Sequence, residues 1–341
     1  MQREWNNIRA RLACALMMGL AVLCALEAAA DPGPASHAPI GVMADHTHHK
    51  GEVMFSYRYM RMGMDGLRDN DDGISRSRVL QDFPVTPTSM DMEMHMFGAM
   101  YAPIERLTLM LMVPYVLLEM DHRTRTGISF TTKSEGIGDV RAIALVDLWQ
   151  HQGHRLHANL GMSFPTGSIR EKDRTPAMMA ARVRLPYPMQ IGSGTFDLLP
   201  GLTYRGHEGA ISWGAQARGE IRLEQNDERY RRGNEYALTG WGAYEFTDWL
   251  SASLRFEWLH ELNYQGRDRA LNPAMVPTAD PGRRAFMRLD ALAGLNFLVP
   301  SGPLSGIRFA VEAGLPAYQR LDGPGLETDW IMTVGVQYAL P

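Results

Sequence analysis

Long segments in which apolar and polar residues alternate constrain the fold of this 341-residue chain more than any other feature. In residues 249–263, for example, Leu254 and Phe256 flank Arg255 in an unbroken alternation. A period of two residues places successive side chains on opposite faces of a β-strand. Twelve segments of 12 to 16 residues follow the pattern, whereas soluble strands typically have about five or six residues. They cover residues 51–63, 89–102, 106–119, 137–149, 154–165, 194–205, 210–223, 235–247, 249–263, 284–299, 305–317 and 328–340.

The connections between these segments are alternately long and short. The long ones cover residues 64–88, 120–136, 166–193, 224–234, 264–283 and 318–327. The short ones lie near residues 103–105, 150–153, 206–209, 247–248 and 300–304. Outer-membrane barrels combine long outer loops, short periplasmic turns and an even number of strands. We therefore expect an all-β fold over residues 51–341: a transmembrane antiparallel β-barrel of the bacterial outer-membrane type with about twelve strands, within a range of about 10 to 14.

The first fifty residues are expected to precede the barrel. A basic start containing Arg3 and Arg9, an apolar run at 12–26 and small residues at 28–30 are typical of a secretory signal peptide over residues 1–30. Both cysteines of the chain lie within it. Residues 31–50 are rich in proline, histidine and small residues, which predicts a flexible periplasmic tail.

Charged residues on the polar faces are the candidates for a pore wall. A charge that faces lipid near the bilayer midplane is costly, so these side chains are expected to point inward. They would set selectivity, or they would pair with one another and stabilise the wall. The candidates are Arg58, Asp91, Glu93, His95, Asp139, Arg141, Arg155, His157, Arg218, Glu220, Arg222, Arg255, Glu257, Arg308 and Glu312.

Twenty-three methionines are an unusual number, and ten of them form two sets on the alternating segments. Five of them alternate with the expected lumenal residues Asp91, Glu93 and His95, so this first set is expected to face lipid: Met90, Met92, Met94, Met96 and Met100. The second set shares a face with Arg58 or Thr108 and is expected in the lumen: Met54, Met60, Met62, Met110 and Met112.

A metal site is the second hypothesis for the tail. Met43, His46, His48 and His49 lie close together in sequence, and short histidine-rich tracts indicate metal binding. Thioether and imidazole ligands suit copper or silver. The alternative is that the methionines serve as flexible apolar filler. No other cofactor is expected.

Several runs resemble one known family. They are HTHHKGEVMFSYRYMRMGMDG (46–66), MEMHMFGAMYAP (92–103), FTTKSEGIGDVR (130–141), FPTGS (164–168), LPYPMQIGSGTFDLLPGLTY (185–204), LNPAMVPTADP (271–281) and LETDW (326–330). Together they are similar to outer-membrane transporters grouped as "MetA-pathway of phenol degradation". The resemblance implies an outer-membrane β-barrel that passes small, aromatic compounds. It assigns no functional residues.

We therefore expect a channel for the passive passage of small hydrophobic or aromatic compounds, exported through a cleaved signal peptide to the bacterial outer membrane. The alternatives are a copper- or silver-binding outer-membrane protein and a closed structural barrel. No enzyme is expected, because no nucleophile lies within reach of a histidine and an acid. The net charge of −4 argues against a nucleic-acid partner. The expected partners are membrane lipid, lipopolysaccharide, the barrel-assembly machinery and a small solute.

Overall fold

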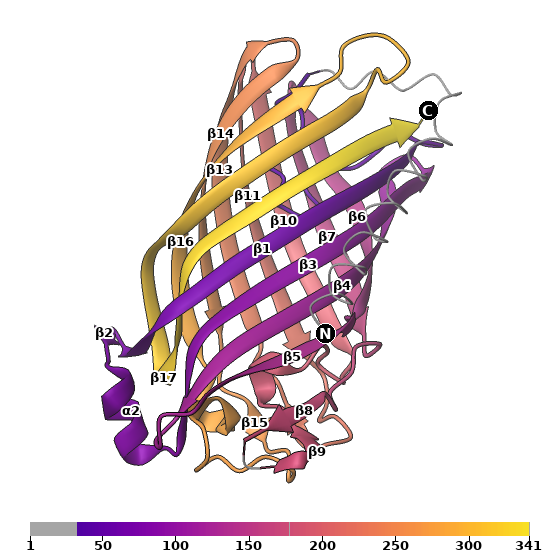
Figure 1. Ribbon diagram of the computed structural model, residues 1–341. Helices are drawn as coiled ribbons and strands as arrows, with labels where there is room; N and C mark the ends of the chain where they lie inside the picture. The colour runs from indigo at the N-terminus through magenta and orange to yellow at the C-terminus, as the bar shows by residue number, and fades with distance from the viewer. Residues whose placement is uncertain (1–32, 177, 341) are drawn as a thin grey trace.

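The computed structural model describes residues 33–176 and 178–340, most of which lie in strands (Figure 1). The predicted signal peptide, residues 1–30, lies outside the described residues. The strands of the main sheet are β1 (Val53–Asn70), β3 (Val85–Ile104), β4 (Leu107–Thr124), β6 (Val140–His151), β7 (His154–Phe164), β10 (Asp197–Glu208), β11 (Ile211–Arg222), β13 (Glu235–Thr247), β14 (Leu250–Glu261), β16 (Phe286–Leu298) and β17 (Ile307–Leu340).

Each of these strands pairs antiparallel with its neighbour along the chain, and β17 also pairs with β1. The closing register runs from Val53 opposite Leu340 to Asn70 opposite Leu321. Closure leaves this sheet without a free edge, so its backbone donors and acceptors are satisfied even inside lipid. The expected antiparallel barrel is confirmed.

Strand β17 runs along the barrel wall twice, once beside β16 and once beside β1. Its residues 308–321 run antiparallel to β16, and its residues 321–340 run antiparallel to β1. Strand direction alternates around the other ten strands, so β16 and β1 point in opposite directions. The two halves of β17 must then also be opposed, and the chain reverses near Leu321. Within the described residues, eleven assigned strands therefore make twelve passes, and these correspond one by one to the twelve alternating segments.

Smaller elements gather at the end of the barrel that carries the long loops, the lower end in Figure 1. Helix α2 (Arg76–Asp82) begins at Ser75, whose side chain accepts a hydrogen bond from the Arg78 amide. None of the helices in the described parts of the chain has the length and apolar composition needed to cross a membrane. The other elements are β2 (Asp72–Gly73), β5 (Ser129–Ile137), β8 (Lys172–Thr175), β9 (Met178–Arg184), β12 (Tyr230–Arg231), β15 (Gln265–Gly266) and the 3-10 helices η1 (Tyr187–Met189), η2 (Pro277–Ala279) and η3 (Pro281–Arg283).

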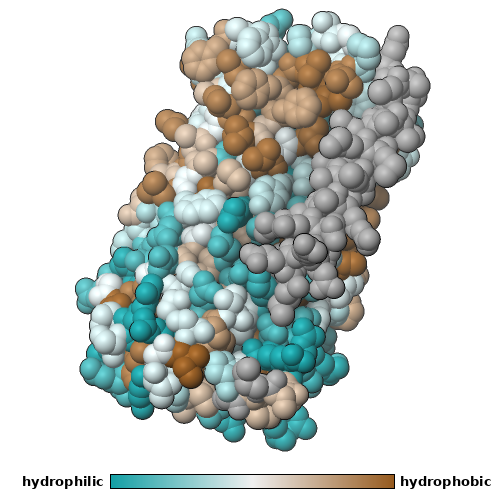
Figure 2. Space-filling model, viewed as in Figure 1, coloured by the Kyte–Doolittle hydropathy of each residue, from teal (hydrophilic) through white to brown (hydrophobic). Residues whose placement is uncertain are grey.

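An apolar band surrounds the short-turn end of the barrel. Figure 2 shows hydrophobic side chains gathered near that end and hydrophilic ones toward the long loops. The band includes Phe97, Leu111, Leu160, Leu254 and Phe309, all exposed on the outer face. A belt of this kind is the surface that contacts lipid. The strands continue past it, so their outer ends project into water.

Residues 33–48 lie inside the barrel at the short-turn end, and we call this segment the plug. Nearly all of its residues are buried. Arg58 of β1 donates through Nε to the carbonyl of Ile40, 3.1 Å away, and Gln216 of β11 donates to the carbonyl of Met43 at 2.9 Å. The expectation of a flexible tail is therefore wrong for these residues. The segment is stable here because inward-pointing side chains of the barrel form hydrogen bonds with its backbone.

The band predicts where a charge is tolerated. Leu254 lies at the centre of β14 and is 65% exposed on the outer face. We expect Leu254→Arg to lower the free energy of unfolding in a phospholipid bilayer by about 2–4 kcal/mol, because the new charge would face hydrocarbon. Leu262→Arg, beyond the end of the same strand, should change it by less than about 1 kcal/mol. Equal losses from both variants, measured by denaturant titration in vesicles, would contradict this placement of the band.

Candidate functional site

The lumen has two unlike walls, one of which is lined by methionine. The side chains of β1, β3 and β4 that point inward are mostly thioethers, and the register sets them side by side: Met54 opposite Met100, Met60 opposite Met94, Met64 opposite Met90, and Met90 opposite Met120. We call this surface the methionine wall. Among the described methionines, twelve belong to it: Met54, Met60, Met62, Met64, Met90, Met92, Met94, Met96, Met100, Met110, Met112 and Met120.

The prediction for β3 is wrong. Met96 is buried and stands opposite Arg58, a side chain only 1% exposed, so the methionine face of β3 points inward. Asp91, Glu93 and His95 occupy the other face of the strand. There Asp91 forms an exposed ion pair with Arg61 at 3.0 Å, and His95 accepts or donates a hydrogen bond at 2.8 Å with the Tyr57 hydroxyl.

The length of the strand explains this error. β3 has 20 residues, more than the bilayer requires, and Asp91 and Glu93 lie in its half nearer the long loops. In that half the outer surface is hydrophilic (Figure 2). A charge is costly on the outer face only within the hydrocarbon, so the rule that charges point inward does not apply to these residues.

The opposite wall carries paired charges. Arg255 of β14 binds Glu312 of β17 through two hydrogen bonds of 2.8 and 2.9 Å, and it also reaches Glu257 at 3.0 Å. Bidentate pairing of this kind is among the strongest charge-assisted contacts. Arg218 of β11 extends the network to Glu257 at 3.4 Å and to Glu235 of β13 at 2.9 Å. These predicted lumenal residues do face inward, and they neutralise one another.

A second group of pairs lies nearer the long loops. Glu220 accepts from Arg222 at 2.5 Å and from Arg141 of β6 at 3.0 Å. Arg222 also binds Asp197 of β10, whose side chain is fully buried. Arg141 and Arg218 keep 32% and 35% of their side chains exposed, whereas Arg222 and Arg255 are nearly fully buried. Of these four arginines, only the first two can therefore meet a solute directly.

Other predicted lumenal residues hold the plug. Arg308 donates to the carbonyls of Gly33 and Pro34 at 2.9 and 3.1 Å. Arg155 of β7 donates to the hydroxyl of Thr47 at 3.0 Å. His157 contacts the carbonyl of Ala44 at 3.1 Å, and Glu312 accepts from the amide of Gly41 at 3.1 Å. Glu245, which is not among the predicted lumenal residues, accepts from the amide of Ala35 at 2.9 Å.

Asp139 has a different role, in the connection between β5 and β6. Its two carboxylate oxygens accept from the amides of Gly167 and Ser193, at 2.8 and 2.7 Å, and so fix the ends of one long loop. Within that loop, Met189 and Ile191 pack against the outer half of the methionine wall. The Ser134 hydroxyl donates to the Met189 carbonyl at 2.7 Å. This loop therefore narrows the lumen at the end opposite the plug.

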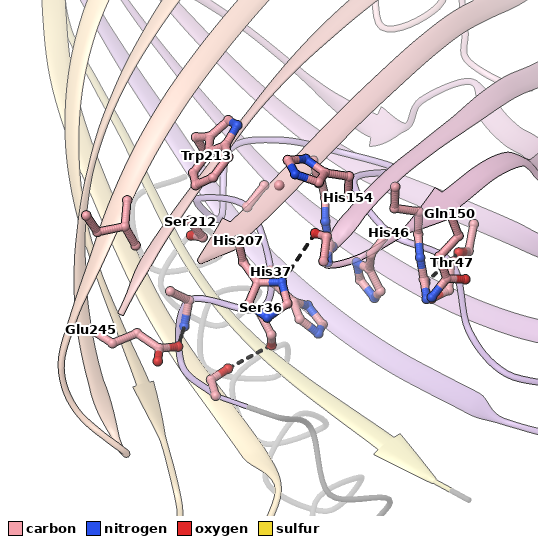
Figure 3. Close-up of a pocket in the computed structure, with 18 of the residues that line it drawn as sticks. Ser36, His37, His46, Thr47, Gln150, His154, His207, Ser212, Trp213 and Glu245 are labelled. Carbon is pink, nitrogen blue, oxygen red and sulfur yellow. Dashed lines mark hydrogen bonds between the residues drawn. The ribbon is translucent and has the colours of Figure 1, made fainter. Parts of the chain in front are cut away.

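Plug histidines converge on a cavity of about 410 Å³ at the short-turn end (Figure 3). The rings of His37 and His46 lie 3.8 Å apart between centroids, and His48 lies 4.8 Å from His46. Burial lowers the pKa of His46 well below its ordinary value, although the carboxylate of Asp45 opposes the shift. Of the four residues predicted to bind metal, only His46 and His48 belong to this group.

The other two predicted ligands point elsewhere. His49 has a side chain 71% exposed, and its Nδ1 lies 4.0 Å from the carboxylate of Glu105. Met43 packs against the inner half of the methionine wall. Sequence reasoning missed His37, in the first half of the plug, and Asp45, next to His46. One sequence signal for His37 exists: the chain has only 11 histidines, and His37 lies nine residues before His46.

The fold resembles solved outer-membrane barrels. The COG4313 outer membrane channel from Pseudomonas putida F1 shares 13% identity, with a TM-score of 0.60 over 87% of this chain and 98% of that chain. The transport unit of the autotransporter AIDA-I from Escherichia coli shares 11% identity, with a TM-score of 0.52 over 88% and 94%. At these identities the likeness shows the fold alone, a β-barrel of the outer-membrane type. No curated protein matches the chain.

A family model described as "Putative MetA-pathway of phenol degradation" matches residues 81–308. The match covers most of the barrel, from the end of helix α2 to the start of β17. It agrees with the resemblance that the sequence runs indicated. The chain belongs to this family of outer-membrane β-barrel proteins.

Proposed function

We propose that the protein is a passive channel for small amphipathic solutes, aromatic acids and phenols among them. The observation that carries the proposal is the two-sided lumen, in which a methionine wall faces a wall of paired charges. A solute with a ring on one side and an oxygen on the other matches both surfaces.

Each wall offers a known type of contact. A thioether sulfur near the edge of an aromatic ring contributes about 0.3–1.5 kcal/mol, and several methionines lie in series along the lumen. On the facing wall, Arg141 and Arg218 retain exposed guanidinium groups that can donate to a carboxylate or phenolate. Weak contacts repeated along a path favour passage, whereas one strong site would retain the solute.

Protein segments occupy both ends of the lumen, and a solute can pass only if each segment moves or leaves a gap. The plug occupies the short-turn end, and the loop containing Met189 lies against the wall at the other end. The plug is held by hydrogen bonds between its backbone and inward-pointing side chains. Such contacts can be exchanged for water one at a time, so we infer that displacement of the plug opens the channel.

Planar-bilayer conductance tests the channel. We expect the complete barrel to show small or rare current steps, and a variant lacking residues 33–48 to show larger and more frequent ones. The variant keeps residues 1–32, so its export signal is retained. Heat-dependent mobility on gels would verify that both barrels are folded. A folded variant that conducts no better than the parent would refute the proposal and favour a closed structural barrel.

The plug anchors predict how readily the plug leaves. The test is to introduce a cysteine at Ala35, which is 5% exposed, and to measure the rate of its reaction with a water-soluble maleimide. Arg308→Ala removes the donors to Gly33 and Pro34, so labelling should accelerate at least about tenfold, the equivalent of one charged hydrogen bond. Arg288→Ala is the matched control, because Arg288 pairs with Asp290. Equal acceleration by both variants would mean that Arg308 does not anchor the plug.

The methionine wall predicts solute preference. In vesicles that contain the plug-deleted barrel, we expect Met92→Ser with Met94→Ser to slow entry of 4-hydroxybenzoate about threefold relative to hexanoate, because one thioether contact with a ring is worth a fraction of a kcal/mol to about 1.5. Met332→Ser should leave the ratio unchanged, because Met332 stands opposite the outward-facing Arg61. If the lumenal pair slows both solutes equally, the wall does not recognise aromatic rings.

A further inference from the structure

Three side chains of the plug converge at its centre. His37 lies in the first half of the plug, and Asp45 and His46 lie in the second half. One donor atom from each of the three lies within 4.8 Å of the others. All three residues are buried, with exposed fractions of 7%, 3% and 4%. Figure 3 shows His37 and His46 at the cavity, which His154 and His207 of the barrel rim also line.

The orientation of His46 is fixed by a carboxylate. Its Nδ1 shares a hydrogen bond of 2.8 Å with Asp45 Oδ1, and Asp45 Oδ2 accepts from the Ala38 amide at 2.9 Å. The Nε2 atom of His46 is then directed away from Asp45, and it has no hydrogen-bond partner among the described residues. A buried nitrogen without a partner costs free energy. An ion held by both residues would take the place of the proton that His46 Nδ1 and Asp45 Oδ1 now share, because these two atoms already face each other.

We propose that His37, Asp45 and His46 bind one divalent transition-metal ion. Two imidazole nitrogens and a carboxylate oxygen suit Cu²⁺ and Zn²⁺, whereas the thioether ligands that favour monovalent copper or silver lie on the methionine wall. This differs from the sequence-based hypothesis in the ligands, of which only His46 is shared. By the general order of stability for such donors, Cu²⁺ binds more tightly than Zn²⁺.

The geometry requires a modest contraction. Metal–nitrogen bonds of about 2.0–2.1 Å in a tetrahedron place donors about 3.3 Å apart, so atoms now up to 4.8 Å apart must close by about 1.5 Å. The ligands lie in a segment of turns and bends that can move by this amount through side-chain rotation. His48, whose ring centroid is 4.8 Å from that of His46, is the nearest further imidazole.

One neighbour opposes the cation. Arg205 of β10 stands 3.8 Å from Asp45 Oδ2, and its positive charge weakens metal binding. Arg205 therefore offers a variant whose affinity for the metal should rise rather than fall. Replacing Arg205 by glutamine should strengthen metal binding, whereas replacing any ligand should weaken it.

The experiment uses the detergent-solubilised full barrel and Cu²⁺ or Zn²⁺ alone, by calorimetric titration and by electron paramagnetic resonance of the Cu²⁺ form. We expect one ion per chain, a tighter Kd for Cu²⁺ than for Zn²⁺, and nitrogen hyperfine splitting from two imidazoles. His37→Gln and His46→Gln should each weaken binding at least about tenfold, because loss of a residue that only supports a ligand already costs about that much. Arg205→Gln should strengthen it severalfold.

His49→Gln is the matched control, because this exposed histidine borders the same cavity without belonging to the cluster. Its affinity and spectrum should equal those of the parent. The proposal is overturned if the folded parent binds no ion, if its spectrum lacks nitrogen splitting, or if His49→Gln loses as much affinity as His46→Gln. Binding that survives deletion of residues 33–48 would likewise overturn it, and conductance measurements on the same variants remain interpretable in either case.

Discussion

The pairing of β1 with β17 is the contact on which the rest of the molecule depends. It converts an open sheet, whose edges would be intolerable in a membrane, into a wall with all its strands paired. A closed wall also creates an inside. The inward face of every strand then has to be covered by other protein groups or by water. In the described residues, methionines, ion pairs and the plug cover it.

The two halves of the lumen solve this problem differently. On β1, β3 and β4, flexible thioethers pack against one another and against both the plug and an outer loop, which lets one surface adapt to several neighbours. On the strands from β6 to β17, buried guanidinium groups pair with carboxylates, as Arg255 does with Glu312 and Glu257, or bind the plug, as Arg308 does. Removing one partner there would leave an uncompensated buried charge, which is far more costly than the pair itself. The charged wall is therefore rigid and the methionine wall is compliant.

The strands could be predicted from sequence because alternation reports a physical requirement, namely one face toward lipid and one toward the lumen. Leu254 and Arg255 show it clearly. The prediction failed on β3, where Asp91 lies beyond the lipid and the requirement no longer holds. The plug could not be predicted, because nothing in residues 33–48 distinguishes a segment held by a polar lumen from one in water. Its partners gave the only hint: Arg58, Arg308 and Glu312 are inward charges that need neighbours.

The plug and the closing seam are adjacent in the chain, and this adjacency bears on how the seam is held together. The plug ends at His48, and residues 49–52 join it to Val53, the first residue paired across the seam. The ring cannot close before Leu340 is available, and by then the plug has long been synthesised. Arg58 and Arg308, which lie far apart in sequence, both bind its backbone. One short segment thus binds both the first and the last strand of the closed wall, so its loss would remove a contact from each side of the seam.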